Sequence, residues 1–127
     1  MPFRLLIADP SRVFRRSVRR LLESEAPDWE VVAETETGQE TVDAACRLSP
    51  DAILLERELG EADGVVVLRR LRRLDTAPAV VMISFDWTPV ARRAARSGGA
   101  AVVLYKEEAA DRLVHSLRRL TREARAD

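Results

Sequence analysis

Four polar residues stand at the ends of four short apolar runs, where their side chains could do chemistry together. Parallel strands with such ends would bring two carboxylates, a hydroxyl and the only lysine of the chain to one edge of a sheet, where ligands of such sheets bind. One acid at a strand end means little, but four polar groups at matching ends indicate a site. The pairs are Phe3–Ala8 with Asp9, Ala52–Leu55 with Glu56, Ala79–Ile83 with Ser84, and Ala101–Leu104 with Lys106 one residue further on.

The elements that must position these residues follow from the hydropathy pattern. The four runs and a fifth, Trp29–Ala33, are apolar nearly throughout, which is typical of strands covered on both faces. The segments between them have helical spacing. After Ser11, for example, Val18 and Leu22 share one face, and the arginines, Arg15 among them, are expected on the solvent face. Five strands alternating with five helices predict an α/β fold, a doubly wound five-stranded parallel sheet forming one domain over residues 1–127.

Composition and charge exclude several classes of protein. Hydrophobic residues make up 46% of the chain, which excludes a mainly disordered protein. The 21 basic and 21 acidic residues balance, so this chain alone is not expected to bind nucleic acid, and its arginine runs are better explained as solvated helix faces. No segment has the apolar length of a membrane span or the pattern of a signal peptide, which predicts a soluble, cytoplasmic protein.

Two reactive residue types occur once each. The single cysteine, Cys46, excludes an intramolecular disulfide and a cysteine-based zinc site. Its helical spacing with Val42 and Ala45 predicts a small buried side chain rather than a redox group. The single histidine, His115, lies beside the apolar stripe of the last helix, and we expect it at the surface or in an interface.

Several stretches carry a resemblance to a known family. They are Phe3–Asp9 with the arginine-rich helix after it, Val31–Glu34 with Gly38-Gln39-Glu40, Pro50–Glu56 with Asp63-Gly64, and Gly99-Ala100 with Leu104-Tyr105-Lys106. In this order they resemble the receiver domains of bacterial two-component response regulators, and the second stretch is similar to the NarL/LuxR subgroup. The resemblance covers essentially the whole chain and implies the flavodoxin-like (βα)5 receiver fold. It further implies phosphorelay chemistry at an aspartate beside Mg²⁺, with a histidine kinase or an effector domain as partner.

The sequence departs from that family at the residues that do the chemistry. Glu56 stands at the position of the phosphoacceptor aspartate, and Pro10 replaces the second of two adjacent acids, of which Asp9 is kept. Mg²⁺ requires near-octahedral oxygen coordination, so we expect its binding to be weak or absent, with Asp9 and Glu56 as ligands if it binds at all. Glu58, two positions past the acceptor, is a candidate for partial compensation by its side chain.

Other positions of the resemblance bear on the same site. Ser84 and Lys106 align with the family's phosphate-binding residues, and a partly buried ion pair between Glu56 and Lys106 is expected to hold this edge of the sheet in place. Phe85 replaces a small residue and could cover the pocket. Val103 aligns with a switch position that is commonly aromatic, and an aliphatic side chain cannot make the same ring movement.

Two functions remain open at this point. The first is a degenerate receiver, or pseudo-receiver: a binding module and not an enzyme, which signals through protein contacts without Mg²⁺-dependent phosphorylation. The second is a phosphorylatable response regulator, including the receiver part of a DNA-binding transcription factor. For the first, the family's fourth helix, fifth strand and fifth helix supply a surface for a homodimer or another partner. Trp87, where this region begins, is either an interface anchor or a partly buried cap over its loop.

Overall fold

The computed structural model of the chain describes residues 1–60 and 62–126, in which strands and helices alternate as the pattern predicts. The strands are β1 (Phe3–Ala8), β2 (Trp29–Thr35), β3 (Ala52–Glu56), β4 (Glu58–Leu59), β5 (Ala62–Asp63), β6 (Ala79–Ser84) and β7 (Val102–Tyr105). The helices are α1 (Arg12–Glu25), α2 (Gly38–Leu48), α3 (Gly64–Arg72), α4 (Pro89–Ser97), the short 3₁₀ helix η1 (Lys106–Glu108) and α5 (Ala109–Ala126).

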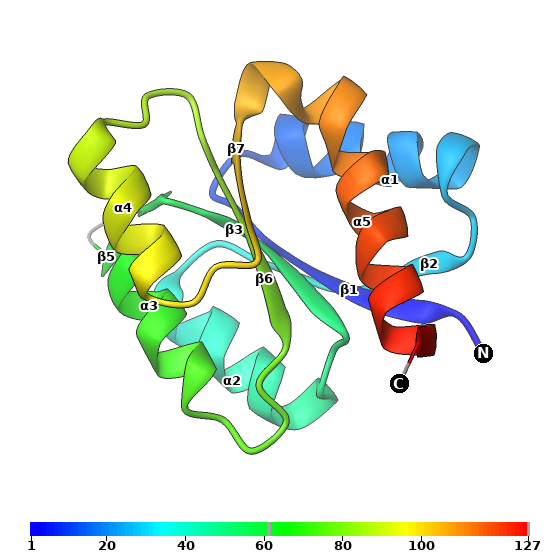
Figure 1. Ribbon diagram of the computed structural model, residues 1–127, viewed down its shortest axis with the longest axis horizontal. Helices are drawn as coiled ribbons and strands as arrows, with labels where there is room; N and C mark the ends of the chain where they lie inside the picture. The colour runs from blue at the N-terminus through cyan, green and yellow to red at the C-terminus, as the bar shows by residue number, and fades with distance from the viewer. Residues whose placement is uncertain (61, 127) are drawn as a thin grey trace.

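Five strands form one parallel sheet in the order β2-β1-β3-β6-β7. Helices α1 and α5 cover one face of this sheet, and α2, α3 and α4 cover the other (Figure 1). This is the predicted doubly wound α/β fold. The strand order reverses between β1 and β3, which places the expected ligand position beyond the carboxyl ends of these two strands.

Two apolar layers, one on each face of the sheet, form the core. Alternate strand residues point into each layer, so Leu6 and Ile53 face α2 and α3 while Ile7 and Leu54 face α1 and α5. Every residue of β3 is buried, as expected for a central strand with helices on both sides. Within the described residues, no helix combines the length and apolar character needed to cross a membrane.

The strands reach further at their carboxyl ends than the apolar runs do. Strand β2 extends to Thr35, β3 includes Glu56 and β6 includes Ser84, because backbone pairing does not stop where the side chains become polar. Strand β7 is displaced by one residue from the predicted run, to Val102–Tyr105. A two-stranded antiparallel pair, β4 with β5, follows β3 and was not expected from the sequence. These extensions place two of the candidate site residues inside the rigid sheet.

The helix starts obey local rules that the sequence shows. Ser11 accepts a hydrogen bond from the backbone of Phe14 and begins α1, and Thr88 begins α4 with Pro89 in its first turn. The prediction for Cys46 was wrong: its side chain is exposed. The buried face of α2 is formed by Gly38, Thr41, Val42, Ala44 and Ala45. Val42 lies near one border of this face, so Cys46, which lies beyond Val42 around the helix, is exposed to solvent.

Candidate functional site

The four polar residues at the strand ends lie at one edge of the sheet and are buried. The pairing of Ala8 with Leu55, and of Ser84 with Tyr105, brings these strand ends level with one another. The exposed fractions are 2% for Asp9, 7% for Glu56, 1% for Ser84 and 8% for Lys106. Charged side chains this deeply buried must find partners within the protein.

Lys106 joins the two carboxylates. Its Nζ lies 2.7 Å from Asp9 Oδ2 and 3.0 Å from Glu56 Oε1, so the ion pair predicted between Glu56 and Lys106 is present and shares its cation with Asp9. The contact to Oδ2 is short but poorly aligned for a hydrogen bond, and its length makes it an ion pair. The cluster of Asp9, Glu56 and Lys106 is called the acid–lysine cluster below.

The remaining carboxylate oxygens of this cluster are also engaged by the chain. Asp9 Oδ1 accepts a hydrogen bond from the backbone N–H of Ser11 at 2.8 Å. Glu56 Oε2 accepts one from the backbone N–H of Glu58 at 3.3 Å. The side chain of Glu58 is exposed, so it enters the site only through its main chain, and the compensation expected from its carboxylate is not present in the structure.

Two aromatic rings flank the ammonium group. Nζ of Lys106 lies 4.5 Å from the centre of the Phe14 ring and 5.2 Å from that of Phe85. Such contacts stabilise a desolvated cation through the negative ring faces. Phe85 is 62% exposed, and it lies over the acid–lysine cluster from the β6–α4 loop, as the covering interpretation predicted.

The electrostatics of the cluster follow from burial. Loss of water on burial raises the pKa of Glu56. This effect outweighs the close contact with the positively charged Lys106, and the negative charge of Asp9 also raises the pKa. Burial by itself would lower the pKa of Lys106. The close contacts of Lys106 with the negatively charged Asp9 and Glu56 outweigh that effect, so the pKa of Lys106 is raised and its charged form is favoured.

The side chains present do not fit the magnesium ion that the family resemblance implies. The ammonium group of Lys106 already lies between the two carboxylates that would have to hold the metal. Pro10 supplies no side-chain ligand. Within residues 1–60 and 62–126, no group of three or more histidine, cysteine, aspartate or glutamate side chains is placed to hold a metal ion.

Ser84 ends β6 beside Tyr105, at the same edge of the sheet as the acid–lysine cluster, but it makes its hydrogen bonds elsewhere. Its hydroxyl donates to Asp86 Oδ1 at 3.1 Å and accepts from the backbone N–H of Asp86 at 3.3 Å. Arg57 donates to the carbonyl of Asp86 at 2.9 Å and thus ties this loop to the end of β3. The sequence did not point to Asp86 or Arg57, because their role depends on two loops meeting in space.

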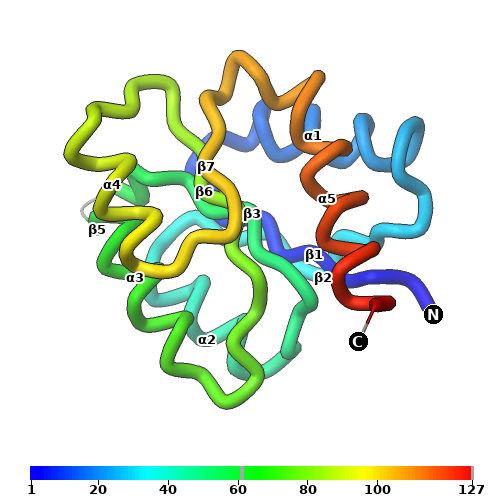
Figure 2. Tube along the Cα trace, in the orientation of Figure 1, coloured from blue at the N-terminus to red at the C-terminus, as the bar shows by residue number. Residues whose placement is uncertain are grey.

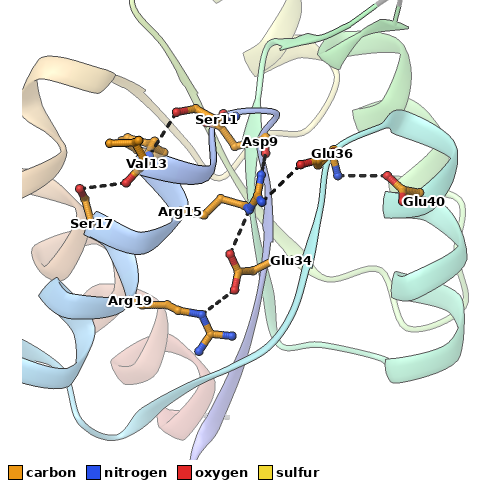
Figure 3. Close-up of polar contacts among 10 residues, drawn as sticks. Asp9, Ser11, Val13, Arg15, Ser17, Arg19, Glu34, Glu36 and Glu40 are labelled. Carbon is orange, nitrogen blue, oxygen red and sulfur yellow. Dashed lines mark hydrogen bonds and ion pairs between the residues drawn. The ribbon is translucent and has the colours of Figure 1, made fainter.

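Arg15 corrects the expectation that the arginines of α1 face solvent. It is 8% exposed, and its Nη1 donates to the carbonyl of Asp9 at 2.6 Å. Its Nε donates to Glu34 at 2.9 Å, and Nη2 lies 3.4 Å from Glu36 (Figure 3). A buried guanidinium with several partners fixes the loop that carries Asp9. The acids in the strand beside α1 were the signal that could have revealed it.

The region beyond β6 settles the two interpretations of Trp87. The indole is 6% exposed, and its Nε1 donates to the carbonyl of Leu104 at 2.7 Å. The interface-anchor interpretation is therefore wrong, because a side chain inside the core cannot contact a partner.

Val103 is half-buried and packs against the same apolar layer as Trp87. His115 is exposed on α5, as expected.

A model of the response regulator receiver domain matches residues 5–118 of the chain. The chain belongs to the response-regulator receiver family. The receiver is 32% identical to the nitrate/nitrite response regulator protein NarP of Escherichia coli K12, over 92% of this chain and 54% of that protein. It is 36% identical to a protein-glutamate methylesterase/protein-glutamine glutaminase of Alkalilimnicola ehrlichii, over 68% of this chain and 22% of that protein. The receiver therefore spans about half or less of these relatives.

Solved structures agree with the fold of the receiver. A LuxR-family two-component response regulator from Aurantimonas sp. SI85-9A1 superposes with a TM-score of 0.87 at 22% identity, over 94% of this chain and 85% of that one. The response regulator domain of Thermotoga maritima CheB gives a TM-score of 0.85 at 23% identity, over 94% and 96% of the two chains. At these identities the likeness establishes the shared fold.

Proposed function

We propose that this receiver domain is a cytoplasmic binding module that signals through protein contacts, without Mg²⁺-dependent phosphorylation and without enzymatic activity of its own. The observation that carries the proposal is the acid–lysine cluster. Lys106 supplies from within the chain the positive charge that the two carboxylates would otherwise share with a bound cation. The cluster therefore holds together without any added ligand.

The same contacts work against Glu56 as a phosphoacceptor. A carboxylate that accepts a phosphoryl group needs a free oxygen to attack phosphorus, and a cation beside it to offset the charge that develops. Both oxygens of Glu56 are engaged, one by Lys106 and one by the backbone of Glu58. Ser84, the expected phosphate-binding hydroxyl, is bound to Asp86 instead. The Phe85 ring adds a steric obstacle over Lys106.

The partner surface proposed for this module is the face built from α4, β7 and α5. The family resemblance offers three candidate occupants, which are a histidine kinase, an effector domain and a second copy of the chain. The face is continuous with the site, because Trp87 and Tyr105 connect the two: Trp87 Nε1 donates to the carbonyl of Leu104, and the Tyr105 hydroxyl donates to the carbonyl of Trp87 at 3.4 Å.

Intact-mass spectrometry after incubation with acetyl phosphate and excess Mg²⁺ tests the proposal. We expect no phosphate adduct on the native chain, and none on Glu56→Asp alone. In that variant Pro10 still provides no carboxylate for the metal, and Phe85 still blocks the position of the phosphoryl group. Adduct formation is expected once Pro10→Asp is added, with Phe85→Ala as the next addition. A stoichiometric adduct on the native chain, or full recovery with Glu56→Asp alone, would refute the proposal and favour a phosphorylatable switch.

A further inference from the structure

A groove with a volume of about 340 Å³ runs along β7, the edge strand of the sheet, between α4 and α5. The two helices lie on either side of β7 (Figure 2). The walls carry basic side chains, and apolar residues from Ala100 to Leu104, in β7 and just before it, form the floor. The basic residues are Arg92 and Arg96 from α4, and Arg112, His115 and Arg119 from α5.

The α4 wall carries positive charge that the chain itself does not neutralise. Arg92 and Arg96 are four residues apart and therefore share one helix face. The whole of α4 contains no acidic residue. In the part of the chain that the structure describes, neither guanidinium has a carboxylate oxygen within ion-pair distance. The guanidinium carbon of Arg92 lies 5.5 Å from the centre of the Tyr105 ring, so its partner within the chain is an aromatic face and not a carboxylate.

The α5 wall differs, because two of its arginines form ion pairs with nearby acids of η1 and α5. Arg112 lies 3.5 Å from Glu108, and Arg119 lies 3.6 Å from Glu123. These exposed ion pairs partly neutralise the positive charge of the α5 wall. The groove as a whole therefore has a positive excess that is concentrated at Arg92 and Arg96.

We propose that this groove binds an acidic segment of another protein, whose carboxylates pair with Arg92 and Arg96. This inference rests on the proposed function, since it names the partner class of the binding module. Arginine suits the task because its planar guanidinium pairs with a carboxylate through two parallel hydrogen bonds. Recognition runs through side chains rather than strand addition to β7. The carbonyl of Leu104 in β7 already accepts a hydrogen bond from Trp87, and that of Ala101, just before the strand, accepts one from Arg119.

Charge also decides against the other occupants. A symmetric homodimer would place this face against itself, and a face with an excess of one sign is not self-complementary. Nucleic acid is disfavoured because Glu108 and Glu123 lie beside the groove and the net charge of the chain is zero. An acidic protein segment can satisfy Arg92 and Arg96 while its apolar side chains rest on the floor.

The test uses the native chain and a fluorescein-labelled peptide of about ten residues, roughly 33 Å when extended, in which glutamate alternates with leucine or alanine. The same peptide with glutamine for glutamate is the negative probe. We expect the acidic peptide to bind, with an affinity that falls as salt is added. The double variant Arg92→Glu, Arg96→Glu should bind it about tenfold or more weakly. The matched control is Arg12→Glu, Arg16→Glu, two exposed arginines four apart on α1, which should bind as the native chain does.

Several outcomes would overturn the inference: equal binding of both peptides, equal loss in the α1 control, tighter binding of a duplex DNA probe, or a stable dimer of the native chain in sedimentation. Because charge reversal at Arg92 removes its contact with Tyr105, Arg96→Gln is made as well, and this exposed substitution should give a smaller loss in a normally folded chain. A phosphate adduct in the mass experiment together with normal peptide binding would defeat only the proposed function. The reverse result would defeat only the groove.

Discussion

The receiver domain places charged side chains in two neighbouring regions that treat them differently. At the carboxyl edge of the sheet, Asp9, Glu56 and Lys106 are buried and satisfy one another. Along β7, Arg92 and Arg96 face an open groove and have no carboxylate partner among the described residues. Both regions border β7. They differ in whether their charged side chains are buried and in whether those side chains have partners of opposite charge.

Because of this difference, we expect one region to contribute mainly to stability and the other mainly to binding. Removing one member of a buried ion pair leaves an uncompensated charge in a low-dielectric environment, which is costly. An exposed arginine contributes little to folding because water and salt screen its charge. The acid–lysine cluster should therefore govern stability, and the groove should govern binding.

The largest effect is expected from Lys106→Ala, which would leave two buried carboxylates facing each other. We predict a loss of about 3 kcal/mol in the free energy of unfolding, measured by urea denaturation. The exposed Arg16→Ala serves as the control and should change stability by less than about 0.5 kcal/mol. A loss of only a few tenths for Lys106→Ala would mean that the cluster is solvated, and the contrast between the regions would disappear.

A smaller, pH-dependent effect is expected from Glu56→Gln. The pKa of Glu56 is raised in the folded state because burial disfavours its charged form. The stability linked to its proton is fully present below the ordinary value of 4.5 and is lost as the pH rises through the raised value. Glutamine stays neutral, and Lys106 keeps Asp9 as its carboxylate partner, so the variant should gain stability relative to the native chain across that window. Unfolding curves at a series of pH values check this, with the exposed Glu58→Gln as control; an opposite trend would show that the charge of Lys106 outweighs burial.

The smallest effect on stability is expected from Arg96→Ala in the groove. Arg96 is exposed and makes no ion pair within the described residues, so its removal should change the free energy of unfolding by less than about 0.5 kcal/mol. The same variant should bind the acidic peptide more weakly. Thermal denaturation measures the change in stability, and fluorescence anisotropy measures peptide binding. A large loss of stability would show that Arg96 contributes to folding as the buried charges do.

The sequence predicted the fold and the residues at its carboxyl edge because both depend on short-range patterns. Apolar runs and helical spacing located the five sheet strands, and the ends of those runs pointed to Asp9, Glu56, Ser84 and Lys106. Arg15 was misplaced because its helix face is buried by the acidic end of β2 rather than by apolar contacts. Trp87 was ambiguous because the carbonyl that receives its indole lies on β7, outside the local pattern.

By itself, the sequence determined the parallel α/β architecture, the edge at which polar groups gather, and the departure from the family at Glu56 and Pro10. Only the tertiary structure decided how those groups pair: Lys106 is shared by two carboxylates, while Ser84 turns to Asp86. The physical reason is range. Hydropathy periods reflect contacts repeated every few residues along an element, whereas ion pairs and hydrogen bonds at a site depend on angstrom-scale distances between loops that only the folded sheet brings together.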